Sequence, residues 1–211
     1  MNPATAEKVS ARHAEVLGQP PRLLPLDRES VGDDVQATTA KLRGGVAGEL
    51  PELPLEAIPE IMFTMCRYPA LWHSMIDLTL QIQGSDALLP LRDRKLAILR
   101  TGWLCQAPYE FGEHVNQAKR AGVTSEEIER ITVGSSAPEW DAHDRALLRA
   151  VDELHGEAMI SDDTWAQLSQ RLNDGQLVEL TILIGQFVAT AYFQNSLRLR
   201  LEEGNKGLAA R

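Results

Sequence analysis

The amino-acid sequence predicts an all-α fold, and three observations support this prediction. Between short clusters of glycine and proline, the chain is dominated by Leu, Ala, Arg, Glu and Gln, which favour helices. Alternating runs of β-branched residues, which are typical of strands, are nearly missing. Apolar residues instead recur at intervals of three and four, the period of an amphipathic helix. The glycine and proline clusters that separate the expected helices lie at 18–21, 44–59, 84–90, 134–138 and 204–207.

Length and composition indicate one compact domain with a peripheral N-terminal part. The chain has 211 residues, of which 44% are hydrophobic and 24% are charged, so it can bury a core. Residues 1–50 are expected to form an N-terminal arm with peripheral helices, one at the N-terminus and one over 33–43. The helical domain proper is expected to span residues 51–211.

The first helices of this domain are predicted from apolar spacing and from the breaks between them. A lead-in over 55–66 precedes a helix over 69–83. Two further helices are expected over 90–105 and 109–121. In the helix over 69–83, the stripe expected to be buried consists of Leu71, Met75, Leu78 and Ile82.

The remaining helices are predicted mainly from their first residues. Thr124 and Glu127 have the spacing of a capping box, which opens a helix to about residue 132. Pro138 suits the first turn of a helix that runs to about residue 157, and Ser161 can cap a short helix after it. The last helix is expected over 175–203. Its middle, LVELTILIGQFVATAYF, is apolar nearly all round, so we expect it to be buried on several sides, partly by a neighbouring subunit.

Charge and cysteine content exclude several classes of protein. The 21 Lys and Arg residues against 30 Asp and Glu residues give a formal net charge of −9, which disfavours nucleic acid and anionic membranes as partners. Cys66 and Cys105 are too few for a disulfide scaffold or a four-cysteine zinc site. The N-terminal segment lacks the apolar stretch of a signal peptide, and no apolar run approaches the roughly 18 residues of a membrane span. We therefore expect a cytoplasmic protein.

One charged residue of the helix over 90–105 falls within its apolar arc. A helical wheel places Lys95 between Ile98 and Leu99, on the side that is expected to face the core. An unpaired buried ammonium group costs several kcal/mol, so Lys95 must be paired, must extend its amine to solvent, or must have a chemical role. The charged residues that fall well away from the centre of this arc are Asp93, Arg94 and Arg100.

The next helix carries two titratable residues on its inward face. Glu110 and His114 are four residues apart, so both side chains lie on one side of the helix. A carboxylate that orients an imidazole is a common acid/base arrangement. We therefore predict a site in which His114, Glu110 and Lys95 are catalytic and the flanking Tyr109 and Cys105 contact the substrate.

Structural alternatives exist for each of these residues. A Glu–His pair at helical spacing can be purely structural, and Lys95 can place its amine at the rim or pair with Glu110. Both cysteines can be small core residues. His73 is expected to be structural, whereas His143 and His155 are expected to be solvated. No metal site is expected, because one Glu-x-x-x-His pair supplies two ligands and zinc needs three or four.

A long stretch around these residues resembles a known family. The sequence LPLRDRKLAILRTGWLCQAPYEFGEHVNQAKRAGVTSEEIERI resembles the carboxymuconolactone decarboxylase family, which includes the alkylhydroperoxidase-D-like proteins. The segments PELPLEAIPEIMFTMCRYPALWHSMIDL and ILIGQFVATAYFQNSL are similar to the longer members, so the resemblance covers about 150 residues. It implies an orthogonal helical bundle and a homo-oligomer, commonly a trimer or hexamer, with sites near subunit contacts.

The chain departs from the family's pattern at two places. Peroxidase-type members carry a Cys-x-x-Cys pair seven and four residues before the histidine, where this chain has Ala107 and Glu110. A dithiol peroxidase mechanism would therefore lack both of its thiols. Members usually carry a glutamate nineteen residues before the histidine, and this chain has Lys95 there. Of the family's proton relay, only His114 is kept.

The resemblance and the site residues together favour a cofactor-independent lyase or isomerase, similar to the decarboxylase branch, that acts on a small carboxylate or lactone. In this hypothesis His114 is the general acid/base, Glu110 orients it, and Lys95 with Tyr109 holds the substrate anion or its enolate. One alternative is a non-catalytic ligand-binding or structural oligomer, in which Lys95 and Glu110 form a buried ion pair. Another is a residual redox role of Cys105.

Overall fold

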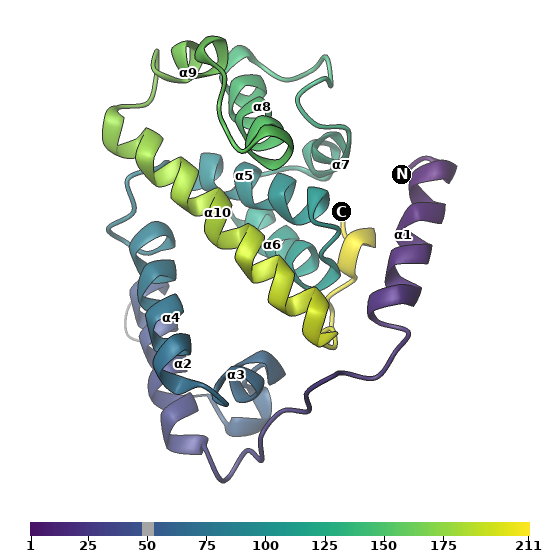
Figure 1. The fold of residues 1–211 in the computed structure, drawn as a ribbon, viewed down its shortest axis with the longest axis vertical. Coiled ribbons are helices and arrows are strands. Elements are labelled where there is room, and N and C mark those ends of the chain that lie inside the picture. Colours follow the sequence, from purple (N-terminus) through teal and green to yellow (C-terminus); the bar gives the residue numbers. More distant parts are fainter. Residues whose placement is uncertain (48–52) are drawn as a thin grey trace. The chain divides into compact units, whose positions relative to one another are not determined.

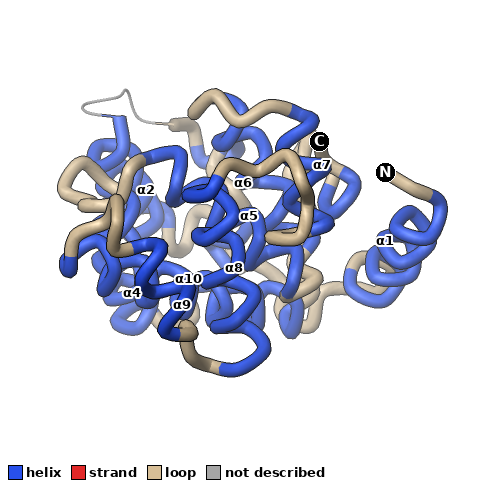
Figure 2. The backbone as a smooth tube through the Cα atoms, turned by 90° about the horizontal axis from the view of Figure 1, so that it is seen from above, coloured by secondary structure: helices blue, strands red, loops and turns tan. Residues whose placement is uncertain are grey.

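The computed structural model describes residues 1–47 and 53–211, and all regular structure in these ranges is helical (Figures 1 and 2). The all-α fold class predicted from the sequence is confirmed. Two short 3-10 helices are η1 (Leu55–Ala57) and η2 (Gly207–Ala209). The α-helices are α1 (Pro3–Val16), α2 (Gly32–Ala47), α3 (Glu60–Met65), α4 (Pro69–Gln83), α5 (Leu91–Leu104), α6 (Pro108–Arg120), α7 (Ser125–Val133), α8 (Ala142–Glu157), α9 (Asp162–Leu168) and α10 (Asp174–Leu197).

The chain divides into two compact units. One unit consists of Met1–Pro20 together with Leu88–Arg211, and the other is Pro21–Ala87. The domain boundary predicted between residues 50 and 51 lies outside the described residues. The assignment of residues 1–50 to a separate arm stays a prediction.

Helix α5 is the centre of the larger unit, where it contacts α6, α7, α8 and α10. Every residue from Asp93 to Gly102 is buried, so Asp93, Arg94 and Arg100, which the wheel places well away from the apolar arc, lie in the core as well, contrary to the wheel. Two of them find charged partners there: Asp93 lies 2.8 Å from Nε2 of His143, and Arg100 lies 2.6 Å from Asp152. The prediction of a solvated His143 is therefore also wrong. A wheel assumes one buried face, whereas helices cover α5 on several sides.

Helix α8 begins at Ala142 rather than at Pro138 as predicted. The side chain of Asp141 accepts a hydrogen bond from the backbone N–H of Asp144 and caps the helix there. The guanidinium of Arg145 fixes the preceding loop, because it donates to the carbonyl oxygens of residues 135, 137, 138 and 140. This cap and these bonds, rather than the proline, decide where the helix starts.

Helix α10 ends at Leu197, although helix-forming residues continue the predicted helix to 203. Arg198 adopts a left-handed conformation with φ of 55°, and the N–H of Leu199 bonds back to the carbonyl of Gln194. The chain then runs back over α6, where Asn205 donates to the carbonyl of Tyr109 at 3.1 Å. Tertiary contacts of this C-terminal segment, residues 199–211, outweigh helix propensity.

Gly112 of α6 allows the C-terminal segment to approach closely. A Cβ atom at this position would lie 1.7 Å from Oδ1 of Asn205 and 2.8 Å from the backbone nitrogen of Gly207. On the far side of this segment, Nε2 of His13 in α1 accepts a hydrogen bond from the N–H of Leu208 at 3.0 Å. The segment is therefore held between α1 and α6.

Of the stripe predicted on helix α4, only Ile82 is fully buried. The buried residues are Trp72, Ile76 and Ile82, whereas Leu71 and Leu78 are exposed. Apolar residues occupy two adjacent sides of this helix, so spacing alone cannot tell which side faces the core.

Helix α10 is the one helix among the described residues that is long and apolar enough to cross a membrane. It packs against α5, α6 and α8, and in Figure 1 it runs across α5 and α6. It also buries Glu179, whose carboxylate accepts from the N–H groups of Leu88 and Leu89 at 2.7 and 3.0 Å. These contacts bury 39% of the most apolar stretch of the helix.

Candidate active site

The site predicted from the sequence is built on the antiparallel pair α5 and α6. Lys95 at the start of α5 contacts Gln117 near the end of α6, with Nζ of the lysine donating to Oε1 at 2.8 Å. At the opposite end of the pair, a Cβ atom on Gly102 would lie 3.5 Å from Cγ of Glu110. The absence of a side chain at Gly102 leaves room for the Glu110 side chain between the helices. His114 lies between Glu110 and Gln117 on the sequence of α6.

Glu110 and His114 form a buried pair. Nε2 of His114 lies 3.1 Å from Oε1 of Glu110, and the histidine and glutamate side chains are 10% and 3% exposed. Within the described part of the chain, neither Oε1 of Glu110 nor Nδ1 of His114 has a hydrogen-bond partner. Buried polar atoms are normally satisfied, and Oε1 already faces Nε2 of His114, so Nδ1 of His114 is the atom of this pair that a ligand could satisfy.

Phe187 of α10 forms one side of this site. Its ring meets the His114 imidazole edge to face, with the ring centroids 5.0 Å apart and the planes at 89°. The contact fixes the plane of the imidazole and keeps water from that side.

Lys95 is buried, with 7% of its surface exposed, as the wheel predicts. Its amine bonds to Gln117, a residue that is itself partly exposed. Burial and the neighbouring Arg94 guanidinium lower the pKa of Lys95 to about 8, while the Glu110 carboxylate partly offsets them. The structure thus holds an amine that titrates near neutral pH close to a carboxylate.

The two residues predicted to bind substrate differ in their placement. The hydroxyl of Tyr109 donates to Glu202 of the C-terminal segment at 3.2 Å, so that segment engages it. Burial and the carboxylates of Glu202 and Glu113 raise the pKa of Tyr109 far above its usual range. Cys105 caps the C-terminal end of α5, and burial and the charge of Glu110 raise the pKa of its thiol to about 11.

Sequence reasoning missed two residues of this site. Gln117 follows His114 by three residues and Glu110 by seven, so the same wheel would have placed it on the inward face. Phe187 gave no such signal, because it lies in a helix that is apolar nearly all round.

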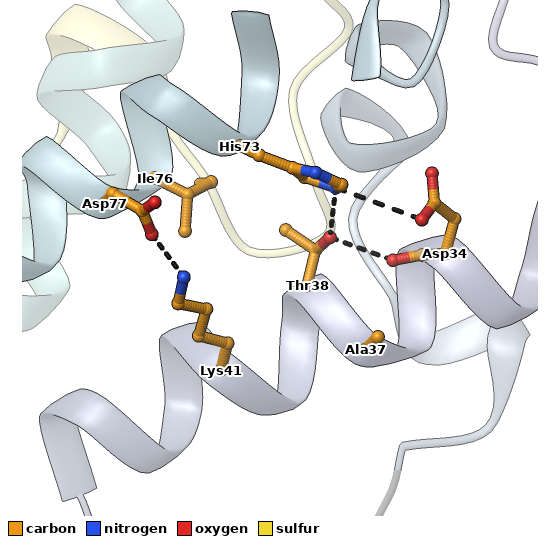
Figure 3. A pocket seen from close by; sticks show the side chains of 7 residues that line it. All are labelled: Asp34, Ala37, Thr38, Lys41, His73, Ile76 and Asp77. Carbon is orange, nitrogen blue, oxygen red and sulfur yellow. Dashed lines mark hydrogen bonds and ion pairs between the residues drawn. The ribbon is translucent and has the colours of Figure 1, made fainter. Parts of the chain in front are cut away.

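A second concave surface lies between α2 and α4 in the unit Pro21–Ala87 (Figure 3). Nε2 of His73 lies 3.2 Å from Oγ1 of Thr38, and Lys41 pairs with Asp77. Its charged side chains are about half exposed and paired with one another. In residues 1–47 and 53–211 no group of three or more His, Cys, Asp or Glu side chains has the arrangement of a metal site.

The sequence was compared with models of known protein families and with curated protein sequences. Residues 68–153 match the model of the carboxymuconolactone decarboxylase family. No curated protein sequence matches the chain significantly.

Solved structures of three proteins are similar. An uncharacterized peroxidase-related protein with an alkylhydroperoxidase AhpD core, from Ralstonia eutropha JMP134, has a TM-score of 0.72 and 13% identity over 90% of this chain and 99% of that chain. The debrominase Bmp8, solved as a variant in complex with 2,3,4-tribromopyrrole, has a TM-score of 0.71 and 13% identity over 89% of this chain and 95% of that chain. A protein of unknown function from Agrobacterium tumefaciens has a TM-score of 0.60 and 22% identity over 65% of this chain and 94% of that chain. At these identities the likeness shows a shared AhpD-like helical fold.

Proposed function

We propose that the chain is a cofactor-independent lyase or isomerase. The premise is that residues 68–153 belong to the carboxymuconolactone decarboxylase family. Its substrate is a small molecule that carries a carboxylate or a lactone. The observation that supports this most strongly is the buried Glu110–His114 pair, in which one oxygen and one ring nitrogen lack hydrogen-bond partners in the described part of the chain. A lyase-like reaction needs no more than a proton carrier and a group that stabilises a developing negative charge.

Each residue of the site has one role in this proposal. His114 moves the proton, and its Nδ1 is the ring nitrogen that is free to exchange a proton with substrate. Glu110 lies against Nε2, where it orients the ring. Lys95 supplies positive charge for the substrate carboxylate or the enolate, and Gln117 holds its amine in place. Because Glu202 engages the hydroxyl of Tyr109, we assign Tyr109 to the wall of the site.

A screen of β-keto acids and lactones tests the proposal, with turnover and ligand-dependent melting as readouts. His114→Asn should lower turnover of the best substrate by about 100-fold to 10,000-fold, the usual contribution of a general acid/base. His155→Asn, at an exposed position of α8, is the matched control and should keep native turnover. If His114→Asn matches the native protein, His114 has no role in catalysis. If no compound of the screen binds or turns over, the result favours the alternative hypothesis of a non-catalytic oligomer over the lyase.

The thiols should be dispensable. Because burial and neighbouring charge raise the pKa of both Cys66 and Cys105, each thiol stays protonated and is a poor nucleophile at neutral pH. Replacing both by serine should leave turnover within a few-fold of native. A loss of about a hundredfold with the melting temperature unchanged would instead favour the redox role of Cys105.

The exposed side of α10 supports a homo-oligomer, a trimer or a hexamer. Val178, Ile182 and Tyr192 are 60%, 47% and 64% exposed and lie along one side of the helix. A monomer would leave this stripe in water. Light scattering at micromolar concentration should give a trimer or hexamer mass, and Ile182→Lys should lower it. Val133→Lys, at an exposed position of α7, should not change it. A monomeric native protein would refute the proposal.

A further inference from the structure

We propose that Lys95 is a nucleophile, and that its amine forms an imine with the carbonyl carbon of a β-keto acid. The inference rests on the proposed function and deepens it, since it names the substrate class and makes the charge-stabilising step covalent. Its basis is a buried amine that is held by Gln117, the residue that follows His114 by about one turn of α6.

The amine is held in a defined place between the two helices. Nζ of Lys95 is fixed by its hydrogen bond to Oε1 of Gln117 at 2.8 Å. Gln117 follows His114 by three residues, so the two side chains leave α6 about 4.5 Å apart along the helix axis, on the same side. The imidazole therefore leaves α6 on the same side as the side chain that holds the amine.

The hydrogen-bond partner suits a nucleophile. An amide oxygen accepts one N–H bond from the amine without adding the negative charge that would keep it protonated. Burial and Arg94 disfavour the ammonium form, whereas the negative charge of Glu110 favours it and offsets part of their effect. With its pKa lowered to about 8, the Lys95 side chain carries the neutral amine more often at neutral pH than an exposed lysine does.

The reaction balances with groups of this site and water. The lone pair of Nζ attacks the carbonyl carbon, a C–N bond forms, and a proton passes from the nitrogen to the carbonyl oxygen. The imidazolium of His114 then protonates this hydroxyl, which leaves as water while the C=N bond forms, and His114 regains a proton from solvent. The electron pair of the bond to the carboxylate moves into the iminium group, which releases CO2 and leaves an enamine.

The second half of the cycle frees the product. The enamine carbon takes a proton from His114, which regains one from solvent, and water hydrolyses the resulting iminium to the ketone. The ammonium form of Lys95 that remains loses a proton to solvent, which restores the amine. Over the whole cycle one proton is taken up and one CO2 is released, with no oxidant, metal or cofactor in any step.

Reductive trapping tests the proposal directly. The native protein is incubated with acetoacetate and sodium borohydride, and its mass is then measured intact and after digestion. The expected result is one added isopropyl group per chain, on Lys95. Lys95→Met should lose this label, whereas Lys119→Met, which changes an exposed lysine of α6, should keep it. If the label is missing from Lys95 in the native protein, with acetoacetate and with a panel of short β-keto acids, the imine proposal is wrong.

A second variant separates the covalent role from a purely electrostatic one. Lys95→Arg keeps a positive charge but has no nucleophilic amine, so it should lower turnover about a hundredfold or more, as far as Lys95→Met does. If Lys95→Arg keeps most of the turnover, or if the native protein turns substrate over without a trapped adduct, Lys95 acts only through its charge. In that case the proposed lyase function stands and the imine does not.

Discussion

Lys95→Met should lower turnover by about a hundredfold or more while it stabilises the folded protein near neutral pH. Both effects follow from one fact, that the amine of Lys95 is buried between α5 and α6 and its pKa is lowered to about 8. A methionine fills a similar volume without a charge to desolvate.

The stabilisation has a defined pH dependence. Between the folded pKa of about 8 and the model value of 10.5, the unfolded chain binds a proton that the folded chain does not, so native stability rises with pH across this window. Below this pH window, both the folded and the unfolded chain carry the proton on Lys95. The folded state then bears the full free-energy cost of the buried charge, about 3 kcal/mol. The difference in unfolding free energy between Lys95→Met and the native protein should therefore shrink by about 3 kcal/mol from pH 7 to pH 10.5.

Urea unfolding at the two pH values measures this difference, with Lys119→Met as the control for loss of an exposed lysine. The control should show no comparable change. A Lys95→Met difference that is the same at both pH values would mean that the Lys95 amine is not desolvated in the folded protein.

Gly112→Ala should destabilise the protein by about 3 kcal/mol or more. The new Cβ would lie 1.7 Å from Oδ1 of Asn205 and 2.8 Å from the backbone nitrogen of Gly207, so the C-terminal segment must move away from α6. The hydrogen bonds of Asn205 to Tyr109 and Glu113 would be lost with it.

Gly156→Ala is the matched control, because it also lies within a helix but has no atom within 4 Å of the new Cβ. It should stabilise the protein by about 0.5–1 kcal/mol. Urea unfolding of both variants checks the prediction. Equal stability of Gly112→Ala and the native protein would show that the C-terminal segment does not pack against Gly112 in solution.

Local signals in the sequence predict a large part of this fold. The capping box of Thr124 and Glu127 and the cap at Ser161 start their helices where predicted, since each depends on residues within one turn. The predictions that fail involve distant contacts. Pro138 does not start α8, because Arg145 binds the loop around it. The last helix stops before its helix-forming residues end, because the C-terminal segment packs on α6.

The contacts of the site also divide into those that a local sequence pattern predicts and those that depend on how distant helices pack. The Glu110–His114 pair could be predicted because both residues lie on one helix at a spacing of four. The partner of Lys95 could not, since it depends on how α5 and α6 align. The buried Asp93–His143 pair likewise joins two helices, α5 and α8, that are distant in sequence.

A double-mutant cycle on kcat/KM with Glu110→Gln and His114→Asn tests most directly whether these two residues act as one acid/base unit. Glu110→Gln should lower kcat/KM by about 10-fold to 100-fold in the native background. In the His114→Asn background it should cause no further loss, because a residue that acts through the imidazole has nothing left to orient. Losses that multiply, or native turnover in the His114→Asn single variant, would contradict a Glu110–His114 acid/base site.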